Sequence, residues 1–257
     1  MPEKVIITGA SGGIGAALAR AYGRRGAVLG LIARRQVELD ALARELGGAV
    51  TTYAADVRDG PAIAAAAGDF LRRFGAPDIV IANAGVSAGN LSHLHDDVET
   101  CQWIFDVNVI GLVKTFQPFL APMLAARSGV LVGIASVAGI RGLPGAGAYC
   151  ASKSAVITYL ESLRVELRGS GVDVVTIAPG YIATDMTANN PYRMPFLLPA
   201  DEAARRFVRA IDARTRYTVI PWPMGAIAKL LRVLPRSVFD RAFAKAKRKP
   251  RRGETSG

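Results

Sequence analysis

Cysteine is scarce in this 257-residue sequence, which contains only Cys101 and Cys150, and no C-x-x-C motif is present. Two such residues do not indicate a disulfide framework, so we expect a reducing, cytoplasmic environment. Long apolar runs are also missing, because stretches such as residues 129–140 fall short of the roughly 18 residues that a membrane-spanning helix needs. The start, MPEKVIITGA, lacks the features of a signal peptide. We therefore expect a mature chain that begins at Met1 and does not cross a bilayer.

Histidine and acidic residues are few as well. His93 and His95 form an H-x-H motif, but no second group of metal ligands accompanies it, and we expect a surface loop and no metal site. The 32 Lys and Arg outnumber the 21 Asp and Glu, giving a net charge of +11. Eight of these basic residues and two of the acidic ones lie in residues 236–257, so the tail carries +6. Nucleic-acid binding fits the charge, but no binding motif supports it, and we expect none.

Apolar, β-branched runs alternate with longer segments of helical period, which argues for a parallel sheet with helices on both faces. The runs are KVIIT, AVLGLIA, AVTTYAA, DIVIAN, GVLVGIAS, VDVVTIA and YTVIP. Helices are predicted between them, for example over residues 14–25, 37–46, 62–74, 98–126 and 149–168. The length and the 51% hydrophobic composition fit one large α/β domain.

A glycine-rich loop, TGASGGIG at residues 8–15, follows the first strand and opens a helix. Amide groups at a helix N-terminus can face a phosphate, and glycines allow its close approach, although the same composition fits a tight turn. The second strand ends in Arg34 and Arg35, where dinucleotide folds usually place an acid that binds the ribose 2′-hydroxyl. Two guanidinium groups can instead bind a 2′-phosphate, which favours NADP(H) over NAD(H). Two solvated arginines are the alternative.

The stretch GAYCASK, residues 147–153, contains Tyr149 and Lys153 four positions apart. If Tyr149 opens a helix, both side chains lie on one face. A nearby ammonium typically lowers the pKa of a phenol by ~1 to 3 units, which would make Tyr149 a usable general acid or base. Ser136 ends a strand at the sheet edge where ligands bind, and Asn108 lies in a predicted helix, where asparagine needs a reason to be present. Singly, each residue also fits packing or capping.

Together, these motifs resemble the classical short-chain dehydrogenase/reductase family in its NADP(H)-preferring form. The matching motifs, in order, are the loop TGASGGIG, Asn83-Ala84-Gly85, the catalytic tetrad Asn108, Ser136, Tyr149 and Lys153, and Pro179-Gly180 followed by Thr184. Two positions depart from the family pattern: Ala82 replaces a frequent asparagine, and Gly12 stands where many NADP-users have a basic residue. Arg34 and Arg35 would then have to supply the cofactor selectivity.

The resemblance implies a Rossmann-type, doubly wound parallel sheet of seven strands, and hydride transfer between a nicotinamide and a carbonyl or carbinol carbon. Tyr149 would pass the proton, and Ser136 would hold the substrate oxygen, so these two are the predicted substrate contacts. Lys153 would hold the nicotinamide ribose and tune Tyr149, and Asn108 would support a water relay. The predicted cofactor contacts are Gly9, Ser11, Gly13, Ile14, Gly15, Arg34, Arg35, Asp56, Val57, Asn83, Ala84, Gly85, Tyr149, Lys153, Pro179, Gly180, Ile182 and Thr184.

Two regions interrupt the alternating pattern. Residues 185–199 contain three prolines and the apolar run MPFLL, which suits a lid over the substrate. Beyond Pro221, apolar residues follow helical spacing on both sides of Pro235. We expect a dehydrogenase domain at residues 1–221 and a basic amphipathic extension at residues 222–257. This extension could cover the substrate cleft, form a dimer interface, or hold the protein peripherally on the inner face of an anionic membrane; a disordered, solvated end is favoured over these.

The apolar lid and tail predict a lipophilic carbonyl or alcohol substrate, such as a long-chain ketone, a 3-oxoacyl compound or a sterol-like ketone. We expect NADP(H) as cofactor, with NAD(H) less favoured, and a homodimer or homotetramer. The competing hypothesis is a catalytically idle NADP(H)-binding sensor or scaffold, against which the intact tetrad argues. Cys150 follows the predicted catalytic tyrosine, but we interpret it as a spectator because no second cysteine is near it in sequence.

Overall fold

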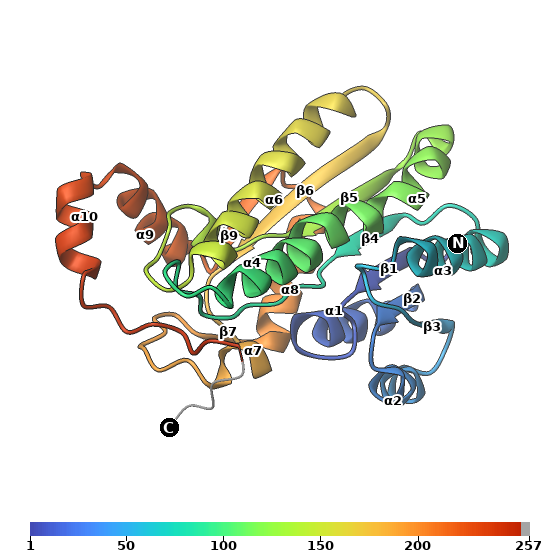
Figure 1. Ribbon diagram of the computed structural model, residues 1–257. Coiled ribbons are helices and arrows are strands. Elements are labelled where there is room, and N and C mark those ends of the chain that lie inside the picture. The colour runs from blue at the N-terminus through green and yellow to red at the C-terminus, as the bar shows by residue number, and fades with distance from the viewer. Residues whose placement is uncertain (253–257) are drawn as a thin grey trace.

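The structure, a computed structural model that describes residues 1–252, is built around a parallel seven-stranded sheet of order β3-β2-β1-β4-β5-β6-β9 (Figure 1). Its strands are β1 (Lys4–Thr8), β2 (Val28–Ala33), β3 (Val50–Ala54), β4 (Ile79–Ala82), β5 (Gly129–Ile134), β6 (Val172–Pro179) and β9 (Tyr217–Ile220). Each predicted run forms one of them. The predicted doubly wound α/β fold in one domain is confirmed.

Helices cover both faces of this sheet (Figure 1). One face carries α1 (Gly13–Gly23), α2 (Gln36–Leu46) and α8 (Ala200–Asp212), and the other carries α3 (Gly60–Phe74), α4 (Asp97–Phe105), α5 (Gly111–Ala126) and α6 (Gly147–Glu166). Each layer has its own apolar cluster, with Phe207 of α8 in one and Phe116 and Phe119 of α5 in the other. Because β2, β4 and β5 are buried at every residue, they appear in the sequence as unbroken apolar runs.

The segment predicted as one long helix, residues 98–126, is helical but not uniform. A π-helical turn over Asp106–Ile110 separates α4 from α5 and contains Asn108. π-helical turns are rare in proteins, and many of those that occur lie at functional sites. By length and composition alone, the continuous stretch Asp97–Ala126 would be apolar enough to cross a membrane, which the apolar-run argument did not detect. Some of its side chains, such as Phe116 and Met123, fill the core, and 33% of its most apolar window is buried inside the protein.

The strand order reverses at β1, which pairs with β2 on one side and with β4 on the other. Connections that leave the carboxyl ends of these neighbouring strands therefore run in opposite directions. In open α/β sheets, the crevice at this reversal is where ligands bind. The glycine loop after β1 and the Asn83-Ala84-Gly85 motif after β4 meet there.

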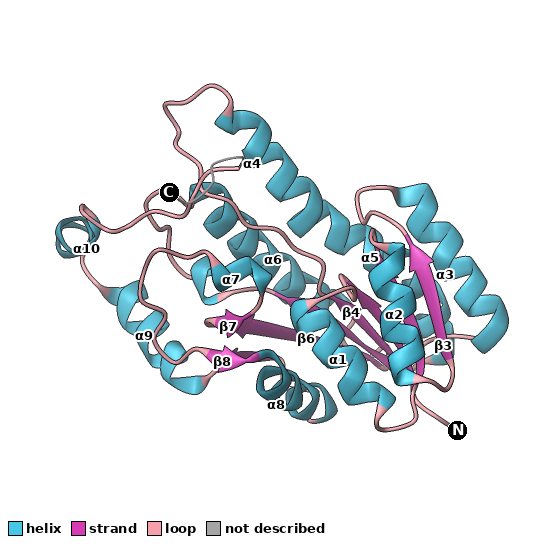
Figure 2. Ribbon diagram, turned by 90° about the horizontal axis from the view of Figure 1, so that it is seen from below, coloured by secondary structure: helices cyan, strands magenta, loops and turns pink. Residues whose placement is uncertain are grey.

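The chain beyond β6 forms the outer part of the molecule. A small sheet pairs β7 (Ile182–Ala183) with β8 (Leu198–Pro199), and α7 (Asp185–Ala188) lies between them. After β9 come α9 (Trp222–Val233) and α10 (Arg236–Phe243), and the chain then runs back toward the start of α4 (Figure 2). The expected disordered end is therefore wrong up to residue 252, because helices and specific contacts order it. The predicted extension's last part, residues 253–257, lies outside the described residues.

Candidate active site

A cavity of about 500 Å³ lies at the carboxyl ends of the strands and extends from β2 and β3 to β6 and α7. Eighteen of the predicted site residues line it: Gly9, Ser11, Gly13, Ile14, Arg34, Arg35, Asp56, Val57, Asn83, Ala84, Gly85, Ser136, Tyr149, Lys153, Pro179, Gly180, Ile182 and Thr184. The exceptions are Gly15 and Asn108, which lie behind its wall. The structure thus brings together residues from seven separate segments of the chain.

The glycine loop is fastened to the loop after β4. Asn83 donates from Nδ2 to the carbonyl oxygens of Thr8, at 3.0 Å, and Gly9, at 3.3 Å. In return, Thr8 Oγ1 accepts hydrogen bonds from the amides of Asn83 and Ala84. Gly9 has a φ of +67°, and a Cβ on Gly15 would overlap the Gly9 carbonyl, so the loop needs glycine at both positions. Thr8 lies inside the quoted motif, yet its function of joining the two loops was not predicted.

Arg35 lies over this loop. Its Nη2 donates to the Ser11 carbonyl at 2.9 Å, and its Nη1 lies 3.1 Å from Glu38 Oε1. A Cβ on Gly12 would come within 3.1 Å of the same Nη2, so the guanidinium occupies the space above Gly12. Arg35 therefore places a positive charge beside Gly12, and the exposed Arg34 adds a second.

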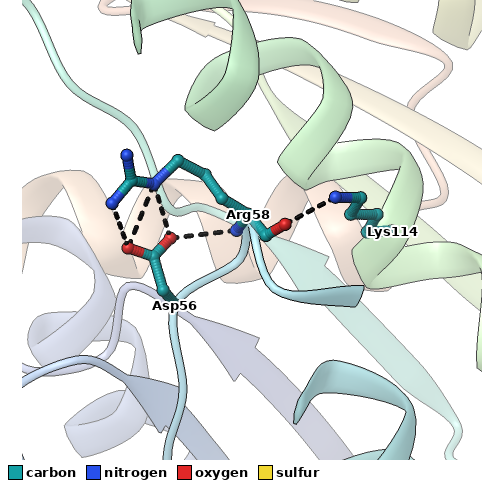
Figure 3. Close-up of polar contacts among 3 residues, drawn as sticks. All are labelled: Asp56, Arg58 and Lys114. Atoms are coloured by element: carbon teal, nitrogen blue, oxygen red, sulfur yellow. Dashed lines mark hydrogen bonds and ion pairs between the residues drawn. The ribbon is translucent and has the colours of Figure 1, made fainter. Parts of the chain in front are cut away.

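Asp56, at the end of the cavity nearest β3, is held by a neighbouring arginine (Figure 3). Its carboxylate accepts hydrogen bonds from Arg58, at 2.8 Å from Nη2 and 2.9 Å from the backbone amide. Lys114 of α5 in turn donates to the Arg58 carbonyl at 2.5 Å. The hydrogen bond from the Arg58 side chain is the main reason that the pKa of Asp56 is lowered. Asp56 thus stays ionised and fixed in orientation, and Arg58 and Lys114 were not predicted from the sequence.

Helix α6 presents Tyr149 and Lys153 to the cavity. The helix begins at Gly147, and its Ala148 amide donates to Asn90 Oδ1 at 3.0 Å, so Asn90 satisfies an amide that the helix itself leaves free. Tyr149 follows in the first turn, and Lys153, 5% exposed, lies one turn further. Both side chains line the cavity, as the four-residue spacing predicts. Lys153 Nζ donates to the carbonyl of Ile134, the last residue of β5, at 2.8 Å.

Burial controls the ionisation of both residues. It raises the pKa of Tyr149, and a hydrogen bond with Ser136 only partly opposes this effect. The same burial lowers the pKa of Lys153 to about 8. We expected Lys153 to lower the pKa of Tyr149. This expectation is wrong, because the pKa of Tyr149 is raised. Burial disfavours the charged form of Tyr149, so the neutral phenol is favoured.

Asn108 organises the wall from behind. Its Oδ1 accepts from the Val86 amide at 2.8 Å, and its Nδ2 donates to the Val86 carbonyl and to Ser152 Oγ, both at 3.0 Å. A Cβ on Gly85 would lie 3.4 Å from both Asn108 Oδ1 and Lys153 Nζ, so a glycine stands between these two polar groups. The direct partners of Asn108 are thus Val86 and Ser152.

Ser152 and Ser136 connect the same elements. Ser152 is fully buried and donates to the Tyr149 carbonyl at 2.8 Å, so it joins the π turn to the helix of the predicted catalytic tyrosine. Nothing in the sequence distinguishes it from other buried serines. Ser136 accepts from the Ala138 amide at 3.2 Å and caps the short helical turn Val137–Gly139. Ser136 therefore caps a helical turn, as one of the two interpretations of its position expected, and it also lines the cavity.

The lid region covers the cavity with different residues from those expected. Asp185, Met186 and Thr187 of α7 line it, whereas Phe196 and Leu197 are 52% and 43% exposed and do not. Two tyrosines not singled out from the sequence, Tyr181 and Tyr192, lie with their ring centres 6.3 Å apart. Burial raises the pKa of Tyr192 to about 12, and Tyr149 adds to this increase, which places the aromatic pair near the catalytic tyrosine candidate.

A doubly wound sheet in which a glycine loop shares a cavity with a helix-borne tyrosine and lysine defines the class of dinucleotide-binding oxidoreductases. The family model described as short chain dehydrogenase matches residues 3–194. The chain belongs to the short-chain dehydrogenase/reductase family, whose members are NAD(P)-dependent oxidoreductases acting on small molecules.

Known proteins agree with this assignment. An uncharacterized oxidoreductase from Myxococcus xanthus is 37% identical over 240 residues, which cover 92% of this chain and 94% of that protein. A short chain dehydrogenase/reductase from Burkholderia phymatum, solved in complex with NAD, is 26% identical with a TM-score of 0.82, over 99% of this chain and 98% of that one. An alcohol dehydrogenase from Thermococcus sibiricus, complexed with 5-hydroxy-NADP, is 28% identical with a TM-score of 0.76, over 86% and 96%.

Proposed function

We propose that this protein is an NADP(H)-dependent oxidoreductase that interconverts a carbonyl group and a secondary alcohol on a lipophilic small molecule. One observation carries the proposal: Ser136, Tyr149 and Lys153 line the same cavity as the glycine loop. Catalytic groups and a phosphate-binding loop in one cavity are what hydride transfer to a bound carbonyl compound requires.

The glycine loop and the arginines beside it support NADP(H) as the cofactor. Gly12, Gly13 and Ile14 line the cavity at the start of α1, so the first amides of this helix are available to the pyrophosphate. Arg34 and Arg35 can bind the 2′-phosphate, and Asp56 and Val57 border the adenine end. When bound, the nicotinamide supplies or accepts the hydride. A cofactor of this kind fits the donors and the shape of the cavity.

The remaining wall residues account for the proton. Tyr149, kept protonated by burial, is in the form that donates a proton to a carbonyl oxygen, and Ser136 holds that oxygen by a hydrogen bond. Lys153, fixed on the Ile134 carbonyl, remains available to the nicotinamide ribose. Asn108 positions the loop of Gly85 and Val86 between these groups.

The lipophilic substrate is supported by the residues around the mouth of the cavity. The apolar side chain of Met186 lines the cavity while remaining 41% exposed. We further propose that residues 1–221, with a lid at about 185–199, form the dehydrogenase domain and that residues 222–257 form its extension. A homodimer or homotetramer is proposed from exposed apolar side chains such as Ile110 and Val165.

Initial rates with a panel of ketones and alcohols test this proposal. With NADPH, we expect reduction of long-chain or cyclic hydrophobic ketones, and with NADP⁺ oxidation of the matching alcohols, with slower turnover on NADH and NAD⁺. Turnover restricted to polar sugars would contradict the lipophilic substrate, and preference for NADH would contradict the cofactor. The sensor or scaffold alternative predicts that NADPH binds while none of these compounds reacts.

A further inference from the structure

The chain after α10 returns along the mouth of the cavity and is fixed there. We call residues 244–252 the C-terminal strap. Its Pro250 carbonyl accepts from the Gly89 amide at 2.8 Å, and Arg251 pairs with Asp97 at 2.8 Å. Asp97 is only 5% exposed, so this ion pair ties the strap to the start of α4 (Figure 2). Arg252 adds a cation–π contact, 4.6 Å from the ring of Trp103.

Within the strap, Lys249 connects the two sides of the mouth. Its Nζ donates to Ser87 Oγ at 3.0 Å and to the Met186 carbonyl at 3.1 Å. Ser87 follows Val86, and both Val86 and Met186 line the cavity. The ammonium group therefore lies at the rim of the cavity, between the loop after β4 and α7.

Lys249 has no acidic partner among the residues that the structure describes. Arg251 is paired with the nearly buried carboxylate of Asp97, but within residues 1–252 no Asp or Glu forms an ion pair with Lys249. Its two hydrogen-bond acceptors are neutral, and an ammonium group has three donors. Burial lowers the pKa of this group to about 8. A half-buried cation without a counter-charge is stabilised when a ligand supplies a negative oxygen.

The position of the strap places this ligand on the substrate side. Arg248 packs on Gly145, the Gly145 carbonyl accepts from the Asn90 amide, and Asn90 caps the helix of Tyr149. The strap thus contacts the loop after β4, at Gly89, and the loop before α6, at Gly145. The described strap contacts do not include the glycine loop, where the cofactor phosphates are expected.

We infer that Lys249 is a specificity-determining residue that binds the anionic end, a carboxylate or a phosphate, of an otherwise apolar carbonyl substrate. This inference rests on the proposed function and narrows its substrate class from lipophilic ketones to amphipathic ones. The apolar part would lie in the cavity, and the charged end would lie at the mouth beside the strap.

Keto acids and their methyl esters, reduced with NADPH, test the inference. The measured quantity is the ratio of kcat/KM for acid over ester, in the wild type, in Lys249→Gln and in Lys247→Gln, an exposed lysine of the same strap. We expect the ratio to fall about tenfold or more in Lys249→Gln, because one charge-assisted hydrogen bond is lost, and to keep its wild-type value in Lys247→Gln. An unchanged ratio in Lys249→Gln overturns the inference. Weaker NADPH binding with an unchanged ratio would also overturn it and assign the anion to the cofactor.

A binding experiment separates this inference from the proposed function. If the wild type reduces no carbonyl compound, calorimetric titration with decanoate still tests the site. Weaker binding to Lys249→Gln than to the wild type supports the anion site, and equal or absent binding contradicts it. Trp103 fluorescence shows whether the strap stays docked in the variant, because Arg252 lies against this ring.

Discussion

Tyr149 and Lys153 lie one helical turn apart, and burial favours the neutral form of each. The phenol keeps its proton because its pKa is raised, and the ammonium loses its proton more readily because its pKa is lowered to about 8. For the proposed carbonyl reduction, this arrangement holds the proton on the group that is proposed to donate it. The positive charge of Lys153 is therefore held at a cost in folding free energy, which gives a testable pH dependence.

Replacing Lys153 by Met should flatten the pH dependence of stability. An exposed lysine has a pKa of 10.5, and burial lowers the pKa of Lys153 to about 8 in the folded protein, so between these pH values the unfolded chain binds more protons. The free energy of unfolding therefore rises with pH in this window, by up to about 1.4 kcal/mol per pH unit for one proton. Urea unfolding between pH 7 and pH 10 measures the slope.

Lys229→Met is the matched control, because this exposed lysine lies on the surface of α9 and should leave the slope as in the wild type. The pKa of Lys249 is also lowered to about 8, so the unfolding free energy of Lys153→Met should still rise with pH, but less steeply than that of the wild type. An identical slope in Lys153→Met and the wild type would contradict the burial effect.

We propose that cofactor choice depends on Arg34 and Arg35, two adjacent residues at the end of β2. Arg34→Ala and Arg35→Ala should each weaken NADPH binding by about tenfold or more and change NADH binding little, because each removes a charge-assisted contact to the 2′-phosphate. Fluorescence titration with both cofactors measures this selectivity. Arg44→Ala, an exposed arginine on α2, is the control. An equal loss of affinity for NADPH and NADH would show that these arginines do not bind the 2′-phosphate.

At the scale of elements, the π turn between α4 and α5 aims Asn108 at the loop after β4. Asn108→Ala leaves the amide and carbonyl of Val86 and the Ser152 hydroxyl without this partner. We expect a loss of about 1–3 kcal/mol in unfolding free energy, together with lower kcat, because the loop beside Lys153 is no longer held. Urea unfolding and steady-state kinetics measure the two effects.

Asn189→Ala is a suitable control for this substitution, because that asparagine lies outside the core at the end of α7. It should leave the unfolding free energy close to that of the wild type. Full stability and activity in Asn108→Ala would show that the π turn does not organise the site.

The strands could be predicted from the sequence because burial on both faces of a parallel sheet demands continuous apolar runs. The placement of Tyr149 and Lys153 in one cavity with the glycine loop could be predicted because the two residues lie one helical turn apart and the loop joins a strand to a helix. The π turn could not, since DVNVI has no local feature that separates it from an α-helical stretch. Ser152 and Asn90 were missed for a related reason: their hydrogen bonds reach partners fixed by tertiary structure.

At the scale of the whole molecule, the C-terminal chain lies beside the mouth of the cleft, where Lys249 contacts Ser87 and Met186. Its basic composition also fits a solvated tail or an anionic membrane, and the sequence could not decide, because Asp97 lies 154 positions from its partner Arg251. In the structure, Lys249 and Arg251 are engaged by the protein itself. Of the alternatives considered for this segment, covering the substrate cleft agrees with these contacts, and we do not propose membrane binding.

Arg141 links the same extension to the active-site loop. It donates from Nη1 to the carbonyls of Leu231 and Leu234, at 2.7 Å for the latter, and its guanidinium lies 4.0 Å from the ring centre of Phe239. The loop that carries Arg141 lies between Ser136 and Tyr149. Helices α9 and α10 are therefore attached to the segment that connects two of the proposed catalytic residues.

The most direct test of the whole account is the reduction of a hydrophobic ketone by NADPH in the wild type and in Tyr149→Phe, with NADPH affinity measured in parallel. Phenylalanine keeps the ring and removes the hydroxyl that is proposed to donate the proton. We predict that kcat falls by about 10²-fold or more, while NADPH binds as it does to the wild type. Undiminished turnover in Tyr149→Phe would contradict the assignment of the proton donor and, with it, the proposed mechanism.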